Sequence, residues 1–286
     1  LSKKIGRSKM SVVINTNYAA VLARKNLAQV QREMDKSVER LSSGKRINNA
    51  ADDAAGSAIA GRMESQIRGL TMGIRHAKDG QSLVGTAEGA MQELNKILQR
   101  MRELAVQSSS GVANPVDRDY LNLEMAQLVS QVDAISVNTK FNSQNVLTGG
   151  TFTFYTDIDI RGATIVTPGA DMAASALAVS VKSVSIGGGV DQADLSNVVS
   201  AIDNALASVD NKRASLGAVA NRFDHIIDNL QNVIMNTVSS KSRIVDTDFS
   251  IETTNLTRNT VLQQAATSML AQANAQKNSI LSLIQG

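Results

Sequence analysis

The chain has 286 residues, of which 43% are hydrophobic and only 3% aromatic, and it contains no Cys and no Trp. The absence of Cys excludes disulfides, thiol catalysis and thiolate metal sites. Four of the 29 basic residues lie within residues 1–9, and without them 25 basic residues stand against 26 acidic ones, so the rest of the chain lacks the basic balance of a nucleic-acid-binding protein. No stretch of about 18 apolar residues occurs, so we expect no membrane insertion.

The chain begins with a short basic extension, residues 1–9, which no apolar segment follows, so it does not have the pattern of a secretory signal. We expect this extension to be disordered or to reflect a mis-set start, with Met10 as an alternative first residue. Over residues 16–42 an apolar residue recurs every three or four positions, which predicts an amphipathic helix. The SSG sequence at 42–44 ends this pattern.

A second and much longer helix is predicted from about Ala54 to Val106, and residues 48–56 are interpreted as a loop and the start of this helix. Either Asp52 or Asp53 is placed to cap the first amides of this helix. The helix contains several glycines, each of which weakens it by roughly 1 kcal/mol relative to Ala. Contacts outside the helix must therefore stabilise it, and the glycines also allow another segment to approach closely.

The middle of the chain changes from helical to strand-like patterns. Residues 108–114 predict a loop, and Asn114 and Pro115 have the features of a helix cap and a first helical residue. This third helix is expected to end near Val137. Alternation with period two predicts strands at 151–160 and 176–186, and we interpret the glycines at 187–189 as a flexible turn because they match no phosphate-binding pattern.

From Asp191 the helical rhythm returns for more than forty residues. Its steps alternate between four and three, which is typical of a coiled-coil seam, and Arg213 interrupts it. A break at 245–250 separates this helix from a final one. We therefore predict a mainly α fold: an elongated, coiled-coil-like bundle of long helices from both halves of the chain, with a small central β-hairpin region at about 150–190.

The sequence shows no credible catalytic set. His76 and His225 lack the spacing of paired metal ligands, and no GxSxG nucleophile motif occurs. Asp52 and Asp53 are adjacent, and adjacent residues do not face each other on a helix. We expect no enzyme activity, no cofactor and no metal site.

The two terminal helices are unusual because each combines an apolar stripe with few bulky residues. Isolated helices are marginal in water, and exposed apolar residues mark interaction surfaces. The remaining faces of the last helix are small and amide-rich, which favours burial within an assembly, although both helices could instead pack on the body of the same monomer. The residues expected to serve polymerisation are Leu27, Val30, Met34 and Leu41 in the first helix and Leu262, Met269, Leu270, Ile280 and Leu283 in the last.

Six sequence blocks in fixed order resemble bacterial flagellin, and together they cover both ends and nearly the whole chain. The hook–filament junction protein shares mainly the N-terminal blocks. The blocks are MSVVINTN (10–17), ERLSSGKRINNAADDAAGSAIAGRM (39–63), LQRMRELAVQSSSG (98–111), KFNSQNVLTG (140–149), LGAVANRF (216–223) and LQQAATSMLAQAN (262–274).

The resemblance implies a structural subunit that polymerises with copies of itself into the extracellular filament used for swimming, after type III export. Residues 10–54 and 247–286 would form an inner-tube domain of terminal helices, and residues 55–246 an elongated helical domain that carries the β insert. The implied partners are an export chaperone on the C-terminal helix and the hook-associated and cap proteins. The alternative is a junction or surface adhesion protein, which would form a limited ring.

The resemblance also implies that the host Toll-like receptor for flagellin recognises the monomer. In the family, the stretch that matches Leu98–Gln107 and the residue that matches Glu124 contribute both to subunit contacts and to this recognition. We expect Arg100 to be a hot spot, a role in which Arg is common. The alternative is that these residues serve axial packing alone. The residues that keep the family pattern are Leu98, Gln99, Arg100, Glu103, Leu104, Gln107 and Glu124.

Overall fold

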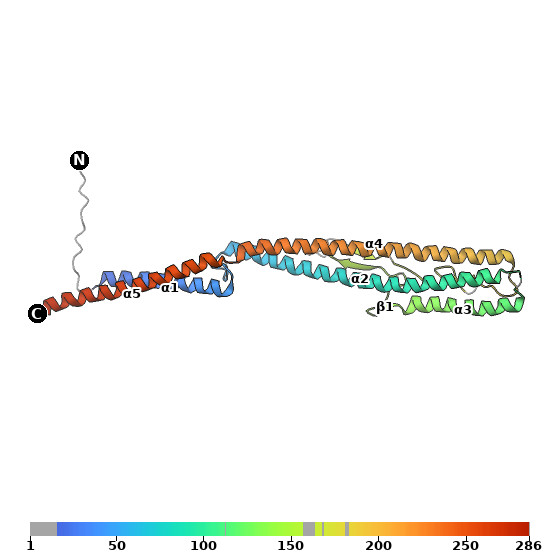
Figure 1. Cartoon of the computed structure of the whole chain (residues 1–286), viewed down its shortest axis with the longest axis horizontal. Helices are drawn as coiled ribbons and strands as arrows, with labels where there is room; N and C mark the ends of the chain where they lie inside the picture. The colour runs from blue at the N-terminus through green and yellow to red at the C-terminus, as the bar shows by residue number, and fades with distance from the viewer. Residues whose placement is uncertain (1–15, 112, 157–163, 168, 181–182, 286) are drawn as a thin grey trace, which may run out of the picture. The chain divides into compact units, whose positions relative to one another are not determined.

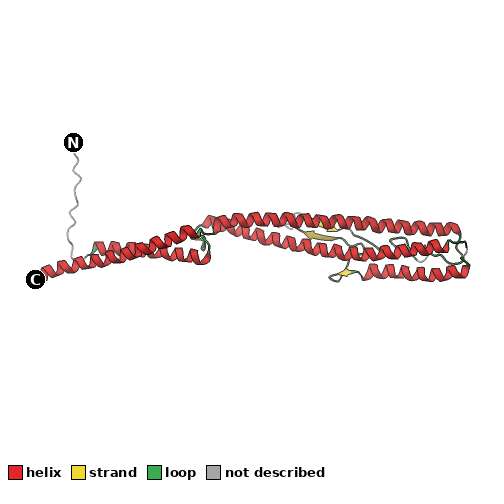
Figure 2. Ribbon diagram, viewed as in Figure 1, coloured by secondary structure: helices red, strands yellow, loops and turns green. Residues whose placement is uncertain are grey.

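The computed structural model of the chain describes residues 16–111, 113–156, 164–167, 169–180 and 183–285, with the backbone alone for Thr164, Gln192 and 277–285. The predicted extension at 1–9 lies outside the described residues. The described part contains five helices and two small hairpins (Figures 1 and 2). The helices are α1 (Tyr18–Ser43), α2 (Ala54–Ser108), α3 (Pro115–Asn138), α4 (Gln192–Val245) and α5 (Phe249–Gln285), and the strands are β1 (Lys140–Phe141), β2 (Gln144–Asn145), β3 (Phe152–Tyr155) and β4 (Thr164–Thr167).

The chain divides into two compact units. The terminal unit comprises residues 1–64 and 239–286, and the central unit comprises residues 65–238. The terminal unit holds α1, α5, the first turns of α2 and the last turns of α4. The central unit holds the rest of α2 and α4 together with α3 and both hairpins.

In the terminal unit, α1 and α5 lie side by side and antiparallel (Figure 1). The side-chain amide of Asn17 donates to the carbonyl of Ala273 at 3.0 Å near one end of the pair. Near the other end, the Arg40 guanidinium lies 3.6 Å from the Glu252 carboxylate. Gly44 ends α1 with φ of 70°, the left-handed conformation that glycine adopts without strain.

The segment between α1 and α2 is tied to the end of α4 within the same unit. The Arg46 backbone N–H donates to the Val245 carbonyl at 2.6 Å, and its guanidinium donates to the Ile244 carbonyl at 2.7 Å. These bonds satisfy carbonyls that a helix C-terminus leaves unpaired. Asp53 Oδ1 accepts from the Gly56 N–H at 2.8 Å, so the predicted capping of the second helix is confirmed.

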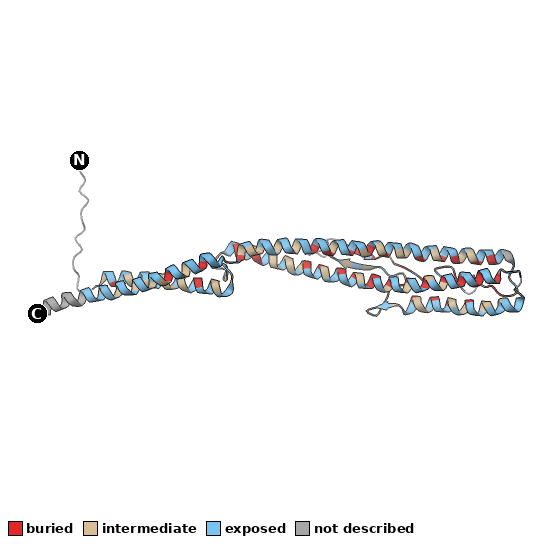
Figure 3. Cartoon of the chain, in the orientation of Figure 1, coloured by how far each residue is buried: buried red, intermediate tan, exposed pale blue. Residues whose placement is uncertain are grey.

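The central unit contains a continuous hydrophobic core between its helices and the β region (Figure 3). Phe223 is fully buried, and its ring meets that of Phe154 edge-on with centroids 5.6 Å apart. A Cβ at Gly80 would overlap the Phe223 ring, so this glycine lets the ring cross α2. The predicted close approach at a glycine of α2 is therefore confirmed at this position.

The two hairpins follow α3. In the first, Asn142 and Ser143 have φ of 47° and 66°, as a two-residue hairpin turn of type I′ requires. In the second, β3 pairs antiparallel with β4, and Phe152 stands opposite Thr167. The strand predicted at 151–160 is confirmed for β3, and its residues 157–160 lie outside the described part of the chain.

The strand predicted at 176–186 is wrong for the residues that the structure describes there. Leu177 and Val179 are buried, as the alternation indicates, but their N–H groups bond to carbonyls four and five positions back. Likewise, Val184 donates to Ser180 at 3.1 Å. The apolar residues therefore reach the core from a chain of turns, in which local hydrogen bonds replace a strand ladder.

The glycine turn at 187–189 packs closely against the start of α3. The Gly188 N–H donates to Asp119 Oδ1 at 2.9 Å, and a Cβ at Gly188 would lie 2.7 Å from the carbonyl oxygen of Pro115. Gly188 thus serves close approach, whereas a Cβ at Gly189 would meet no neighbour. The predicted cap is confirmed, since Asn114 forms a capping box with Asp117 and Pro115 begins the helix.

Within the described residues, no helix combines the length and apolar character that crossing a membrane requires. The described part of the chain also brings together no group of three or more His, Asp or Glu side chains that could hold a metal ion.

Candidate assembly and recognition surfaces

The least exposed residues of α1 and α5 follow a spacing of alternating threes and fours, which is the spacing of a coiled-coil seam. Five of the residues expected to serve polymerisation lie on this seam, so they pack between the two helices of one chain. They are Leu27, Val30, Met34 and Leu41 of α1 and Leu270 of α5, all of them half-buried.

The seam is thin and partly polar. Few described positions of α1 and α5 are buried, as Figure 3 shows. The buried residues are Ala20, Ser37, Glu252 and Asn259, and only the first is apolar. Hydrophobic stabilisation grows by roughly 25 cal/mol per Å² of apolar area buried, so a seam of small and polar side chains gains little. The contacts within one chain therefore hold this pair weakly.

Large apolar side chains project instead from the outer faces of the pair. Met269 is 65% exposed and Leu262 is 45% exposed, and both were expected to serve polymerisation. Ile280 and Leu283 lie on α5, but their side chains fall outside the described residues. Apolar residues on every side of a helix pair favour coverage by other molecules. The further exposed members of this set are Tyr18, Val21, Leu22, Val38, Phe249, Ile251 and Val261.

The structure separates the seven residues predicted for receptor recognition into two sets. Leu98 and Leu104 are completely buried in the core of the central unit. The other five are exposed, and four of them lie on one face of α2 while the fifth lies on α3. The exposed five are Gln99, Arg100, Glu103, Gln107 and Glu124.

Arg100 links two of the exposed carboxylates. Its Nε lies 2.9 Å from Glu124 Oε1 on α3, and its Nη1 lies 3.1 Å from Glu103 Oε2 on α2. The hydrogen bond to Glu124, and then the one to Glu103, raise the pKa of Arg100 above its usual value. Exposed ion pairs contribute little to stability, so the main effect of these bonds is to hold the guanidinium in one orientation.

A shallow groove of about 510 Å³ runs beside Arg100 along α2. Gln99, Glu103 and Gln107 line it together with Arg102 and Val106. The family pattern did not indicate the last two, although each lies three residues after a predicted member of the same helix face. Arg102 is fixed by a 2.7 Å ion pair to Asp203 of α4, and Val106 is 50% exposed.

The matches to family models decide what this architecture is. Residues 14–151 match the bacterial flagellin N-terminal helical region, and residues 199–284 match the bacterial flagellin C-terminal helical region. The chain belongs to the bacterial flagellin family. As a flagellin it is a structural subunit that polymerises into the flagellar filament, which serves motility.

The similarity to individual flagellins extends over nearly the whole chain. A flagellin of Halalkalibacterium halodurans is 39% identical over 277 residues, covering 96% of this chain and 100% of that protein. The flagellar filament 31.3 kDa core protein of Treponema maltophilum is 36% identical over 286 residues, with the same two coverages. These matches include the C-terminal region, and they confirm the predicted flagellin.

A solved structure supports the fold. The structure of a putative flagellar hook-associated protein from Vibrio parahaemolyticus aligns with a TM-score of 0.57 and 13% identity, covering 68% of this chain and 100% of that one. At this level of identity the likeness concerns the fold alone. It agrees with the prediction of a mainly helical chain with a small β region.

Proposed function

We propose that the α1–α5 pair is the part of this flagellin that neighbouring subunits bury in the filament. The distribution of apolar residues supports this proposal: Ser37, Glu252 and Asn259 are buried on the inside of the pair, whereas Val261 and Met269 are exposed on the outside. A helix pair that is stable without neighbouring subunits would bury its apolar side chains between the helices and expose its polar ones.

Burial between subunits would supply the stability that the pair lacks. Fully covering one side chain such as Met269 contributes about 1.5–3 kcal/mol, and several such residues are exposed. Ordering the two helices costs conformational entropy, which subunit contacts must offset. Growth should therefore proceed from an existing filament end, where neighbours already stand in place.

Seeded polymerisation tests the proposal. Depolymerised protein is added to short filament seeds, and the critical concentration and filament length are measured by sedimentation and negative-stain electron microscopy. Met269→Gln should raise the critical concentration about tenfold, which corresponds to a loss of about 1.4 kcal/mol. Val166→Thr, at an exposed residue of β4, is the control and should leave growth unchanged. Growth of the Met269→Gln protein at the wild-type critical concentration would contradict the proposal.

We further propose that the host Toll-like receptor for flagellin recognises the monomer through the exposed α2–α3 surface around Arg100. What supports this is the grouping of Gln99, Arg100 and Glu103 on one exposed face, with Glu124 beside them. Leu98 and Leu104 would act only by positioning this face from the core, because both are buried.

A cell reporter of receptor signalling tests this second proposal. Arg100→Ala should weaken activation by the monomer at least about tenfold, in line with an arginine hot spot. Arg222→Ala is the matched control, since Arg222 is an exposed arginine of α4 that no ion pair engages among the described residues. Unchanged signalling by Arg100→Ala would leave these residues with a role in axial packing alone.

The remaining family expectations are proposals of the same kind. We propose type III export, an extracellular location, an export chaperone that binds α5, and contacts with hook-associated and cap proteins. We also propose a structural role without catalysis, and a division into an inner-tube domain of residues 10–54 and 247–286 and an outer domain of residues 55–246. A junction protein would instead form discrete rings in the seeded assay.

A further inference from the structure

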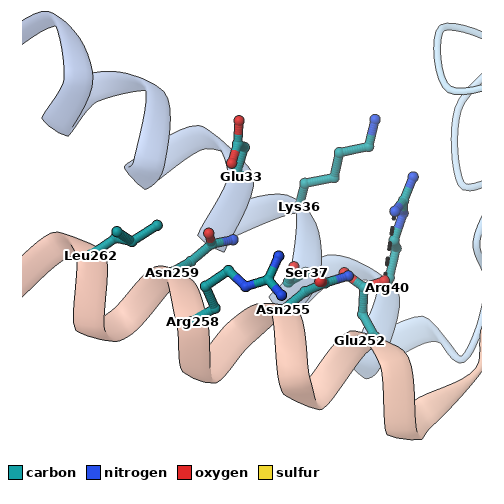
Figure 4. Close-up of a pocket in the computed structure, with 9 residues that line it drawn as sticks. All are labelled: Glu33, Lys36, Ser37, Arg40, Glu252, Asn255, Arg258, Asn259 and Leu262. Atoms are coloured by element: carbon teal, nitrogen blue, oxygen red, sulfur yellow. Dashed lines mark ion pairs between the residues drawn. The ribbon is translucent and has the colours of Figure 1, made fainter.

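A pocket of about 310 Å³ lies between α1 and α5 in the terminal unit (Figure 4). None of the predicted site residues accounts for it, apart from Leu262 at its edge. Most of its lining is polar, although it lies between helices whose outer faces are apolar. The lining residues are Glu33, Lys36, Ser37, Arg40, Glu252, Asn255, Arg258, Asn259 and Leu262.

Two buried polar side chains of this pocket lack partners. Ser37 is 3% exposed and Asn259 is 6% exposed, and neither side chain forms a hydrogen bond with any described residue. The Nε of Arg40 is also buried without an acceptor. Buried polar groups in folded proteins are almost always hydrogen-bonded, so a ligand that accepts hydrogen bonds here would satisfy Arg40 Nε, and Ser37 and Asn259 line the same pocket with donors that remain free to bond.

The lining of the pocket carries three cations, Lys36, Arg40 and Arg258, and two anions, Glu33 and Glu252. Lys36 is paired with Asp52 at 2.8 Å and points away from the pocket in Figure 4, and the Arg40 guanidinium is paired with Glu252. Arg258 has no ion pair within the described part of the chain. Figure 4 shows its guanidinium extending from α5 toward Ser37 on α1. Arg258 is therefore an exposed guanidinium at this pocket, without an ion pair of its own among the described residues.

Glu33 keeps its negative charge at the pocket, but no ion pair joins it to Arg258 among the described residues, and Figure 4 shows its carboxylate pointing away from that guanidinium. Glu33 Oε1 accepts instead from Gln29 Nε2 at 3.1 Å. The pocket thus presents a guanidinium, two side-chain amides and a hydroxyl that can all donate. A carboxylate suits this set, because a guanidinium binds its two oxygens in a planar, bidentate geometry.

We propose that this pocket binds the carboxylate of an Asp or Glu side chain of a neighbouring copy of this chain. A second copy is the occupant that the surroundings favour, because the exposed apolar residue Leu262 lines the pocket and flagellins polymerise. The carboxylate would fix the register of one subunit against the next, whereas apolar contacts alone tolerate sliding. This inference rests on the proposed burial of the α1–α5 pair.

Zero-length crosslinking tests the proposal. Arg258→Lys is mixed as a minority, with one isotopic label, into filaments of wild-type chain carrying another label. A carbodiimide then joins lysine amines to carboxylates in direct contact, and mass spectrometry identifies peptides crosslinked to Lys introduced at position 258. Arg32→Lys, at an exposed arginine of α1 without an ion pair among the described residues, measures the background for this helix pair.

Crosslinks between differently labelled copies, from position 258 to an acidic residue, are expected at several times the background yield. Crosslinks confined to one copy, for instance to Glu33 or Glu252, would overturn the proposal, and so would a yield equal to that of Arg32→Lys. Calorimetric binding of succinate to the depolymerised chain, abolished by Arg258→Gln, would assign the pocket to a free carboxylate and overturn the neighbouring copy as its source.

The failure of this proposal can be told apart from that of the proposed function. If Met269→Gln impairs growth but position 258 gives no crosslink between copies, the α1–α5 pair is buried and the carboxylate site is wrong. If Met269→Gln has no effect, the burial of the pair itself is wrong.

Discussion

The α1–α5 pair and the helices of the central unit share one sequence rhythm but have different interiors. In the central unit, the positions spaced by threes and fours are filled by Leu94, Leu98 and Met101, all completely buried. In the pair, the corresponding buried positions include Ser37 and Asn259. Periodicity therefore indicates which face of a helix meets a partner, and the size and polarity of the residues indicate how strongly.

This difference has a direct energetic consequence. Each fully buried Leu or Met of the central unit contributes about 1.5–3 kcal/mol, whereas a buried polar group adds stability only when it is hydrogen-bonded. We infer that the central unit is the stable part of the monomer. Under the proposed burial between subunits, the pair would acquire its stability from its neighbours in the filament.

Removing the largest core ring should have the largest effect on the monomer. Phe223→Ala empties a site enclosed by Gly80 and Phe154 and should lower the free energy of unfolding by about 3–5 kcal/mol. Thermal unfolding followed by circular dichroism measures this loss. A stability within about 1 kcal/mol of the wild type would show that this core is less decisive than its packing indicates.

The same kind of truncation in the pair should affect the monomer much less. Leu27 is only half-buried, so Leu27→Ala should lower the free energy of unfolding by about 1 kcal/mol or less, while raising the critical concentration for seeded growth. Leu98→Ala, in the central core, is the matched comparison, and it should destabilise the monomer strongly. Equal losses of monomer stability in the two variants would remove the distinction between the units.

Loss of the cap at the start of α2 should have a smaller effect that stays within the terminal unit. Asp53→Ala leaves the Gly56 N–H without its acceptor and removes one partner of Arg46. Amide hydrogen exchange should accelerate over the first turn of α2 and remain unchanged at Leu98. Faster amide exchange in the central unit would contradict this expectation, because it would show that the Asp53 cap also stabilises the central core.

The smallest effect should appear only in acid. The ion-pair hydrogen bond from Lys36, followed by the backbone N–H groups of Asn49 and Asn48, lowers the pKa of Asp52 from 3.8 to about 2. Because the folded pKa is depressed, the stabilisation by Asp52 is complete above pH 3.8 and disappears as the pH falls toward 2. Hydrogen exchange in this loop should therefore rise across that window in the wild type but not in Asp52→Asn. A loop with the same acid response in both proteins would contradict this role.

The sequence predicted local structure well where one residue decides the outcome. Asn114 and Asp53 cap helices as expected, because a short polar side chain before a helix can bond the free amides nearby. The strand predicted from the alternation at 176–186 was wrong, because every second residue can be buried without a neighbouring strand to pair with. Whether the N–H of Val179 bonds to another strand or to the turn behind it depends on what lies alongside.

The candidate surfaces show the same limit. Leu98 and Arg100 both keep the family pattern, yet the Leu98 side chain is buried in the core and the Arg100 side chain is exposed. The reason is that residues two positions apart on a helix point in different directions. Leu27 and Met269 both read as apolar assembly residues, yet one faces α5 and the other faces outward. No sequence signal indicated that Arg258 would lack a partner.

The amino-acid sequence by itself determined the helices, their breaks, the caps at Asp53 and Asn114 and the resemblance to flagellin. These features are local, or they are sequence blocks in the order that the family shares, so they do not depend on contacts between residues distant in the sequence. Only the tertiary structure decided which apolar residues pack within the chain, which project outward, and where donors meet without an acceptor. Those outcomes depend on contacts between α1 and α5, whose residues lie more than two hundred positions apart, and periodicity within one helix carries no information about the residue that will face it.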